Sequence, residues 1–350
     1  MTYNQTQQRL SVQPIVQKAL SLLSDRNATM LAARFGLSEN GSRETLESIG
    51  RTYSITRERV RQIEEASYHK IRNSAQYELL MPSLERVNEF ISSRGGVVAE
   101  EQLLSELVTE AQRPHLSLLL AISNDLEKIK ESDAYRTAWA LSRTHAETAK
   151  TVLSSLVDYI KEAGAPVSNE KLFAVAQESA GDTLAMTPET FEAILSISKV
   201  VKKSPFGRWG LASWPQVSPR GVRDKAYLVF EREERPLHFR DIAGLIDEAP
   251  FEQKSNRGTH PQTVHNELIK DERFVLVGRG TYALAKWGYT PGTVKDVIMN
   301  VLQTEGNALH RDEIIDRVLK QRMVQKNTVL LNLQNKKHFK KTGDNYFILS

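Results

Sequence analysis

The chain has 350 residues, 40% of them hydrophobic and 26% charged, and this length allows two or more domains with folded cores. It contains no cysteine, which excludes disulfide frameworks, cysteine-ligated zinc and thiol catalysis. The net charge is only +4, the first residues lack the apolar core of a signal peptide, and no apolar run approaches a membrane span, so we expect a cytoplasmic protein.

The first strong pattern in the chain predicts a helix–turn–helix between Thr45 and Arg72. A short helix ends before a tight turn at residues 53–55, and Thr56 can cap the N-terminus of a second helix. Spacings of three and four residues place the apolar positions on one side of each helix. The residues expected to face inward are Leu46, Ile49, Gly50, Val60, Ile63, Ser67 and Ile71.

The opposite face of the second helix begins with a polar group that we call the head patch: Arg57, Glu58, Arg61 and Gln62. Arginine can pair with guanine, glutamine with adenine and glutamate with cytosine, so the head patch could read base edges in a major groove. A helix–turn–helix presents this end of its second helix to the bases. The alternative interpretation is a solvated, salt-bridged helix face.

The run TLESIGRTYSITRERVRQIE, from Thr45 onward, resembles region 4 of the bacterial sigma-70 family, which recognises the promoter −35 element. The resemblance includes ALSLLSDR at 19–26 and MLAARFGL at 30–37, and covers roughly residues 15–75. It implies base-reading roles for Arg57, Glu58, Arg61 and Gln62, and places Thr56 and Arg59 near the DNA backbone. The chain differs from housekeeping members of the family at residues 65–67. Those members usually carry a small residue and then a lysine that transcription activators contact.

A complete sigma factor also needs an aromatic-rich segment before region 4 that melts and holds the −10 strand. Only about fourteen residues precede the first helix of the head, so we expect a chain that is not a complete sigma factor. The resemblance then implies recognition of −35-like DNA, docking on the polymerase flap, or both.

After the head, the sequence repeats four times with a period of about seventy residues. Each repeat has a helix breaker or polar turn, an apolar anchor, and a second apolar residue five positions later. The anchor pairs are Val98 and Leu103, Val167 and Leu172, Leu237 and Ile242, and Leu309 and Ile314. The first anchors lie 69, 70 and 72 residues apart, and this regularity indicates tandem domains.

Each repeat also ends alike, with an aromatic residue in an apolar run: Trp139, Trp209, Tyr282 and Tyr346. A hairpin is clearest at 274–284, and helices followed by a hairpin predict a winged helix. The predicted fold is mainly α with small β-hairpin wings, in a helix–turn–helix head (1–80) and four tandem winged-helix domains (81–145, 146–217, 218–288 and 289–350). We expect the second anchors to be buried, with the matching aromatic against them on the last strand.

The third repeat carries the most specific of the repeat patterns: PLHFRDIA at 236–243, TVHNEL at 263–268 and RFVLVGRGTY at 273–282. These segments resemble a HARE-type winged helix, a module that also forms the folded part of the delta subunit of some bacterial RNA polymerases. The fourth repeat is similar but weaker, with LHRDEI at 309–314.

The two ends of the chain carry an excess of positive charge, whereas residues 81–217 carry an excess of negative charge. Residues 1–80 hold 11 basic and 8 acidic side chains and residues 289–350 hold 10 and 6, whereas residues 81–217 hold 14 and 18. Phosphate contacts supply most non-specific affinity for nucleic acid, so the ends are the expected DNA-facing parts. At the C-terminal end we predict backbone contacts by Lys336, Lys337, Lys340 and Lys341, here called the C-terminal lysines, unless they form only a solvated face.

Catalytic motifs are missing from the sequence, which contains no GxxxxGK, HExxH or GxSxG. His238 and His310 stand at equivalent helix starts, where capping or packing explains them better than metal binding. We therefore expect no enzyme activity, cofactor, metal or small-molecule ligand.

Together these patterns predict a DNA-binding transcription factor or RNA polymerase-associated regulator in the bacterial cytoplasm, associated with the nucleoid. Its expected partners are promoter-like double-stranded DNA and the RNA polymerase core. Two alternatives remain open: a protein-interaction scaffold of winged helices, and an accessory subunit of a DNA-processing system.

Overall fold

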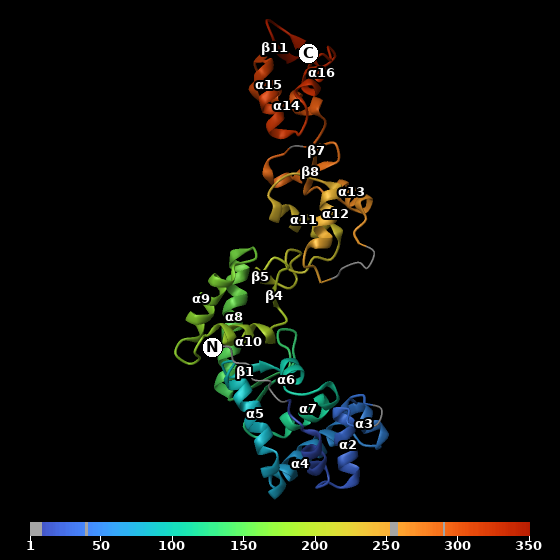
Figure 1. Cartoon of the computed structure of the whole chain (residues 1–350), viewed down its shortest axis with the longest axis vertical. Coiled ribbons are helices and arrows are strands. Elements are labelled where there is room, and N and C mark those ends of the chain that lie inside the picture. Colours follow the sequence, from blue (N-terminus) through green and yellow to red (C-terminus); the bar gives the residue numbers. More distant parts are fainter. Residues whose placement is uncertain (1–8, 39–40, 253–257, 290) are drawn as a thin grey trace. The chain divides into compact units, whose positions relative to one another are not determined.

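The computed structural model describes residues 9–38, 41–252, 258–289 and 291–350, and it separates into two compact units (Figure 1). Unit 1 comprises Met1–Lys203 and Gly207–Ala212, and unit 2 comprises Ser204–Phe206 and Ser213–Ser350. Helices dominate both units, and the strands of the described residues pair in small antiparallel sheets. The mainly helical class predicted from the sequence is confirmed.

Unit 1 begins with a four-helix head, followed by two repeats of the same element order. The head comprises α1 (Gln13–Leu20), α2 (Asp25–Phe35), α3 (Leu46–Thr52) and α4 (Arg57–Arg72), and η1 (Ala75–Leu79) follows it. Repeat 1 comprises α5 (Met81–Ser92), β1 (Val97–Ala99), α6 (Glu100–Glu106), η2 (Glu110–Gln112), α7 (Arg113–Ile122), β2 (Glu127–Ile129) and β3 (Ala138–Ala140). Repeat 2 comprises α8 (Arg143–Ala163), α9 (Asn169–Ala180), α10 (Pro188–Ile197), β4 (Val201–Lys203) and β5 (Trp209–Leu211).

Unit 2 holds the other two repeats. Repeat 3 comprises α11 (Val222–Glu233), β6 (Leu237–His238), α12 (Phe239–Glu248), α13 (Pro261–Ile269), β7 (Phe274–Gly278), β8 (Thr281–Leu284) and η3 (Ala285–Trp287). Repeat 4 comprises α14 (Val294–Glu305), β9 (Leu309–His310), α15 (Arg311–Gln321), α16 (Lys326–Leu333), β10 (Phe339–Lys341) and β11 (Tyr346–Leu349). We call α7, α10, α13 and α16 the third helices of their repeats.

The predicted helix–turn–helix is confirmed as α3, a four-residue turn and α4. Thr56 caps α4, because its hydroxyl accepts the backbone N–H of Arg59 at 3.1 Å. Met30, Ile49 and Val60 form the small core that holds α2, α3 and α4 together. The inward stripe of α4 is also confirmed, with Val60, Ser67 and Ile71 buried and Ile63 half-buried.

Gly50 brings the two helices of the motif close together. A Cβ atom at this position would lie 2.7 Å from the backbone oxygen of Ile55, which the turn holds in place. We expect Gly50→Ala to lower the free energy of unfolding by about 1–3 kcal/mol, because overpacking forces the backbone to shift. Gly244→Ala on α12 is the matched control, since nothing lies within 4 Å of its Cβ position, and it should stabilise by roughly 0.5–1 kcal/mol. Chemical denaturation of both variants checks this, and equal stabilities would contradict it.

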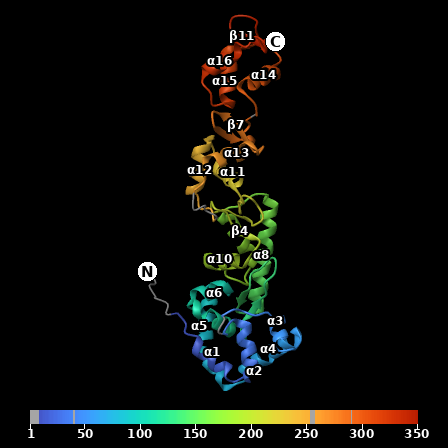
Figure 2. The same ribbon diagram turned by 90° about the vertical axis from the view of Figure 1, so that its right-hand side faces the viewer.

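The head and repeat 1 share one hydrophobic core. It joins Val12 (the N-cap residue before α1), Val16 of α1 and Ile71 of α4 to Leu118 and Leu119 of α7, and all five side chains are fully buried. α7 contacts α1, α2 and α4, and Figure 2 shows these three head helices gathered in the same part of unit 1. Because α7 is apolar on almost every side, it lies between the head and the rest of repeat 1 and belongs to both.

In all four repeats, the first anchor pairs with the last strand. Val98 lies opposite Trp139, Val167 opposite Trp209, Leu237 opposite Tyr282, and Leu309 opposite Phe347. The second anchors are fully buried, as predicted: Leu103 on α6, Leu172 on α9, Ile242 on α12 and Ile314 on α15.

The prediction for Tyr346 is wrong. Tyr346 lies on β11 as expected, but its side chain is 45% exposed, and Phe347 instead pairs with Leu309 and packs on the core. Successive side chains of a strand point to opposite faces, so choosing the neighbouring aromatic reverses the face. Trp209 is also only half-buried, and its indole N–H donates to Asn169 Oδ1 at 2.9 Å.

Repeats 3 and 4 are joined inside unit 2 by backbone pairing and a buried arginine. Arg322 donates through Nη1 to the backbone oxygen of Leu276 at 2.6 Å and through Nη2 to that of Gly292 at 2.8 Å. The backbone N–H of Met323 donates to the oxygen of Val277 at 2.9 Å. The chain after α15 therefore covers the outer edge of β7, which would otherwise expose unpaired backbone groups.

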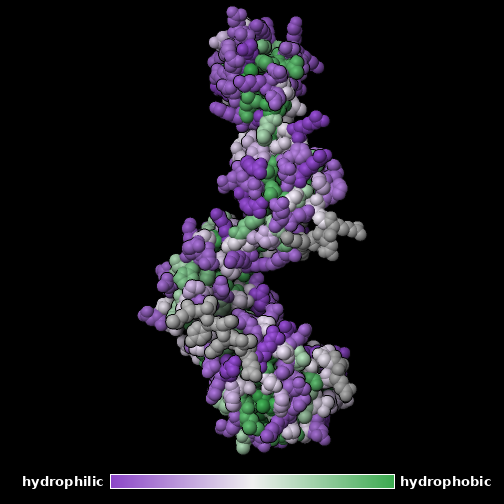
Figure 3. Space-filling model, viewed as in Figure 1, coloured by the Kyte–Doolittle hydropathy of each residue, from purple (hydrophilic) through white to green (hydrophobic). Residues whose placement is uncertain are grey.

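The visible surface of both units is largely hydrophilic, with apolar side chains showing only in small patches (Figure 3). Among the described residues, none of the helices is both long and apolar enough to cross a membrane.

Candidate nucleic-acid interface

The head patch lies on the first two turns of α4, with all four side chains exposed. Residues 57 and 61 are four apart, as are 58 and 62, so the patch forms one continuous surface of the helix. One face of the C-terminal half of the same helix is buried, because Tyr68 and Ile71 pack in the core shared with α7. One end of α4 is therefore anchored while the other presents polar groups.

Arg61 and Glu58 pair with each other in the head patch. The Arg61 guanidinium donates to both oxygens of Glu58, with Nη2–Oε1 at 2.8 Å and Nε–Oε2 at 3.0 Å. This hydrogen bond lowers the pKa of Glu58, which therefore stays ionised at neutral pH. Exposed pairs of this kind are weak, so a base edge can compete for either partner.

The remaining arginines of this surface differ in their partners. Arg59 Nη1 donates to the Gln62 side-chain oxygen at 3.1 Å, so Arg59 and Gln62 orient each other on the exposed side of the helix. Among the described residues, the Arg57 side chain has no ion pair or hydrogen bond, and it is free to meet a phosphate or a base. The solvated-face interpretation predicted internal pairing, and the patch shows one such pair, Arg61 with Glu58, while Gln62 is paired with Arg59 beside the patch.

Arg72, the last residue of α4, is a functional element that the sequence patterns did not single out. Its guanidinium donates to three successive backbone oxygens at the end of α7, those of Ala121, Ile122 and Ser123, at 3.1, 2.6 and 3.0 Å. These oxygens carry the negative end of the α7 dipole, so a cation stabilises them. Because the partners are about fifty residues away, no local spacing could have indicated the contact.

The C-terminal lysines lie on and before the hairpin of repeat 4. Lys336 and Lys337 precede β10, while Lys340 and Lys341 lie on it, and all four are exposed without an ion pair among the described residues. β10 is an edge strand of its sheet, in the order β10-β11-β9. Lysines on an edge strand also discourage edge-to-edge aggregation, which is the structural alternative to phosphate binding.

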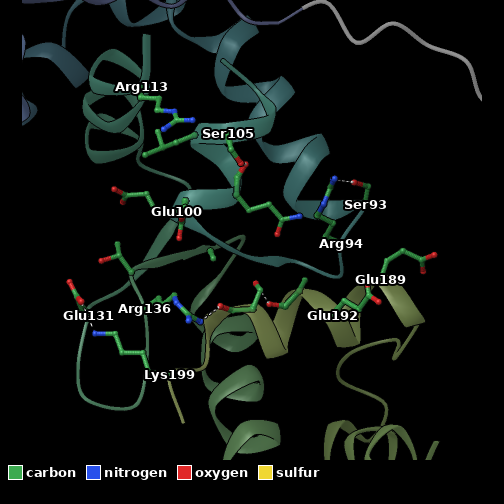
Figure 4. Close-up of a pocket in the computed structure, with 17 residues that line it drawn as sticks. Ser93, Arg94, Glu100, Ser105, Arg113, Glu131, Arg136, Glu189, Glu192 and Lys199 are labelled. Atoms are coloured by element: carbon green, nitrogen blue, oxygen red, sulfur yellow. Dashed lines mark hydrogen bonds and ion pairs between the residues drawn. The ribbon is translucent and has the colours of Figure 1, made fainter. Parts of the chain in front are cut away.

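An open cleft of about 1260 Å³ lies between repeats 1 and 2 in unit 1 (Figure 4). Some of the charged side chains that line it have partners: Lys199 Nζ lies 2.6 Å from Glu131 Oε1, and Arg136 Nη1 donates to the backbone oxygen of Ser196 at 2.8 Å. Arg94 turns away to Glu106 at 2.7 Å. The cleft is thus a polar seam between two repeats.

The histidines at helix starts are caps, as predicted. His238 Nδ1 accepts the N–H of Arg240 at 3.3 Å, and His310 Nδ1 accepts that of Asp312 at 3.3 Å. His260 caps α13 in the same way, through the N–H of Gln262 at 3.2 Å. Within the described residues, no three His, Asp or Glu side chains are grouped to hold a metal ion.

Comparison with known proteins places the head in a family. The family Sigma-70, region 4 matches residues 19–73. Over 70 residues, 20% of this chain, the sequence is 40% identical to the RNA polymerase sigma factor SigA of Listeria monocytogenes and equally to that of Listeria innocua. Over 72 residues it is 39% identical to the RNA polymerase sigma factor RpoD of Helicobacter pylori.

The family match lies in the head, and the aligned segments cover about a fifth of this chain and a small part of each relative. The aligned segment is 18% of the Listeria proteins and 11% of the Helicobacter protein. The matched residues 19–73 contain α2, α3 and α4 with the head patch on α4. Residues 19–73 of this chain thus form a sigma-70 region 4 helix–turn–helix domain.

Proposed function

We propose that this protein is a DNA-binding transcription regulator that reads −35-like promoter DNA with α4 and associates with the RNA polymerase core. The observation that carries the proposal is the exposed head patch at the N-terminal end of α4, within a sigma-70 region 4 domain. Arg57, Glu58, Arg61 and Gln62 offer the donors and acceptors that a major groove recognises. The proposal includes no catalysis, and it assigns the protein to the bacterial cytoplasm at the nucleoid.

Thr56 and Arg59 are proposed to contact the DNA backbone beside this patch. The Thr56 hydroxyl oxygen accepts the N–H of Arg59, which leaves its hydrogen available for a phosphate. Arg59 is exposed and is paired only with a neutral amide, so its charge is not neutralised. Such contacts position a protein on DNA without reading its sequence.

The four repeats are proposed to be winged helices, with repeat 3 of the HARE type. Support comes from the recurring order of helix, anchor, helix, third helix and hairpin, and from the pairing of each first anchor with the last strand. The association with RNA polymerase is supported by the matched relatives, which are named RNA polymerase sigma factors, and by the region 4 match at residues 19–73.

Replacing the four C-terminal lysines by glutamine is expected to flatten the salt dependence of DNA binding. Each lost phosphate contact should reduce the slope of log K against log salt by about 0.9, because fewer counterions are released. Sequence preference should stay the same. Fluorescence anisotropy at several salt concentrations measures the slope, with Lys320→Gln in the exposed end of α15 as the single-charge control. If the slope is unchanged by the four substitutions, the lysines do not contact phosphates and serve only to prevent pairing of the exposed β10 edge with another strand.

Association with polymerase is tested by a pull-down of RNA polymerase core with the full chain, with and without promoter DNA. Recovery of the core without DNA supports direct docking, and recovery only with DNA supports joint binding to a promoter. If the core is recovered under neither condition, the proposed association with RNA polymerase is wrong.

A second candidate function is a protein-interaction scaffold. It is favoured by one observation: repeats 1 and 2 lie in the acidic middle of the chain, and the exposed face of α10 carries Glu189 and Glu192. Such a surface repels phosphates and suits a protein partner. A chain that recovers polymerase core but binds no duplex would favour this candidate over the first.

A further inference from the structure

The four repeats differ in how much of the third helix is free. α7 and α10 each bury six residues, whereas α13 and α16 each bury only two. α7 is enclosed by the head, and α10 packs against β1 of repeat 1. A helix enclosed by protein, as α7 is, cannot enter a groove of DNA, and the exposed face of α10 carries Glu189 and Glu192, which repel phosphates. Within the described residues, only repeats 3 and 4 therefore present a third helix suited to DNA.

Charge separates these two repeats. From the start of the third helix to the end of the hairpin, residues 326–349 contain five lysines and one acid, Asp344, while residues 261–284 contain three basic and three acidic side chains. In repeat 3, Lys270 pairs with Glu267 at 3.4 Å and Arg273 with Asp271 at 2.7 Å. Positive charge that is unpaired attracts phosphate most strongly, and repeat 4 has far more of it.

The outer face of α16 carries a stripe that leads directly to these lysines. The stripe consists of Asn327 and Leu331 on the helix and of Gln334, the C-cap residue directly after it. They lie at steps of four and three residues and are all exposed, Leu331 by 66%. The amide side chains of Asn327 and Gln334 have no hydrogen-bond partner among the described residues. We call these three residues the α16 stripe.

We propose that repeat 4 is a second duplex-DNA contact, in which the α16 stripe enters the major groove and the C-terminal lysines hold the adjacent phosphates. This rests on the proposed function of the chain as a DNA-binding protein and extends it to a second reading helix. Asparagine and glutamine pair with adenine, and an apolar side chain can contact the thymine methyl group. The expected ligand is therefore an A·T-containing duplex, read separately from the bases read by the head.

An exposed leucine between amides could also anchor a protein partner. Residues 326–349 carry five lysines and one aspartate, and this excess of positive charge favours DNA, because its phosphates are attracted to the lysines. If the stripe binds a protein instead, substitution of Asn327 and Gln334 should leave the affinity for DNA unchanged.

The test uses the full chain and a fluorescein-labelled duplex that the full chain has selected from random sequence. The double substitution Asn327→Ala and Gln334→Ala should weaken binding to this duplex by about tenfold or more, with little change for an alternating G·C duplex. The matched control is the exposed amide pair on α13, Gln262→Ala with Asn266→Ala, which should change neither affinity. Hydroxyl-radical footprints of wild type should show two protected segments, and the α16 double variant should lose one.

Two results would overturn the inference: unchanged affinity in the α16 double variant, or a loss in the α13 control instead. The Arg61→Ala variant, measured separately, distinguishes failure of this inference from failure of the proposed DNA reading by the head. If only Arg61→Ala weakens binding, the head reads DNA and repeat 4 does not. If only the α16 double variant weakens binding, repeat 4 reads DNA and the head does not.

Discussion

Replacing Leu119 by alanine is expected to destabilise the head and repeat 1 together, by about 2–5 kcal/mol, because the substitution leaves a cavity in a fully buried site. Leu119 lies on α7, in the core that also contains Ile71 of α4 and Val16 of α1. A cavity at this point removes contacts from the head as well as from the repeat. Hydrogen exchange measured by mass spectrometry should therefore show the same loss of protection in peptides from α4 and from α7.

Ile269→Ala is the control for this prediction. Ile269 is 63% exposed on α13, so its truncation should change the free energy of unfolding by no more than about 0.5 kcal/mol. If Leu119→Ala lowered protection in α7 but left α4 unchanged, the head would be an independent domain that merely touches repeat 1.

Arg61→Ala or Gln62→Ala is expected to weaken binding to a selected duplex roughly ten- to a hundredfold and to relax one base position, because each substitution removes one of the side chains proposed to pair with a base. Arg61→Ala also removes the ion-pair partner of Glu58, which leaves an unpaired carboxylate in the proposed reading surface. Footprinting and competition with single-base variants of the duplex measure both effects.

Arg51→Ala is the matched control for the loss of an arginine. Arg51 lies on α3 and pairs only with exposed Glu47, at 3.4 Å. Its removal changes the net charge as Arg61→Ala does, but it should leave the base preference intact. A base preference that survives in Arg61→Ala and Gln62→Ala alike would exclude the head patch as the reading surface.

The helix–turn–helix could be predicted from the sequence because all its determinants are local. The Thr56 cap, the close approach at Gly50 and the inward spacing of Val60, Ser67 and Ile71 each act within a few residues. Such signals survive in any tertiary setting, and the match to residues 19–73 covers the same segment.

The shared core could not be read from spacing in the same way. Arg72 meets its three carbonyl partners across about fifty residues, and only the folded chain brings them together. One signal was available: the run LSLLLAI at 116–122 is apolar on every side, and such a helix is typically buried. The same signal distinguishes α7 from α16, whose outer stripe is exposed.

The misplaced aromatic of repeat 4 shows a different limit. Tyr346 and Phe347 are neighbours, and both fit the pattern of an aromatic before an apolar run. Only strand register decides between them, and the register follows from the pairing of Leu309 with Phe347. The match among the four repeat ends therefore located the strand correctly but chose the residue on the wrong face.

Recognition of specific duplex DNA by the head is tested most directly by binding-site selection. The full chain and its Arg61→Ala variant are each used to select from random duplexes, and the bound sequences are compared. We expect the wild-type chain to enrich a short motif and the variant to lose one base position of it while keeping the others. Failure of the wild type to enrich any motif, or the same motif in both selections, would contradict base reading by α4.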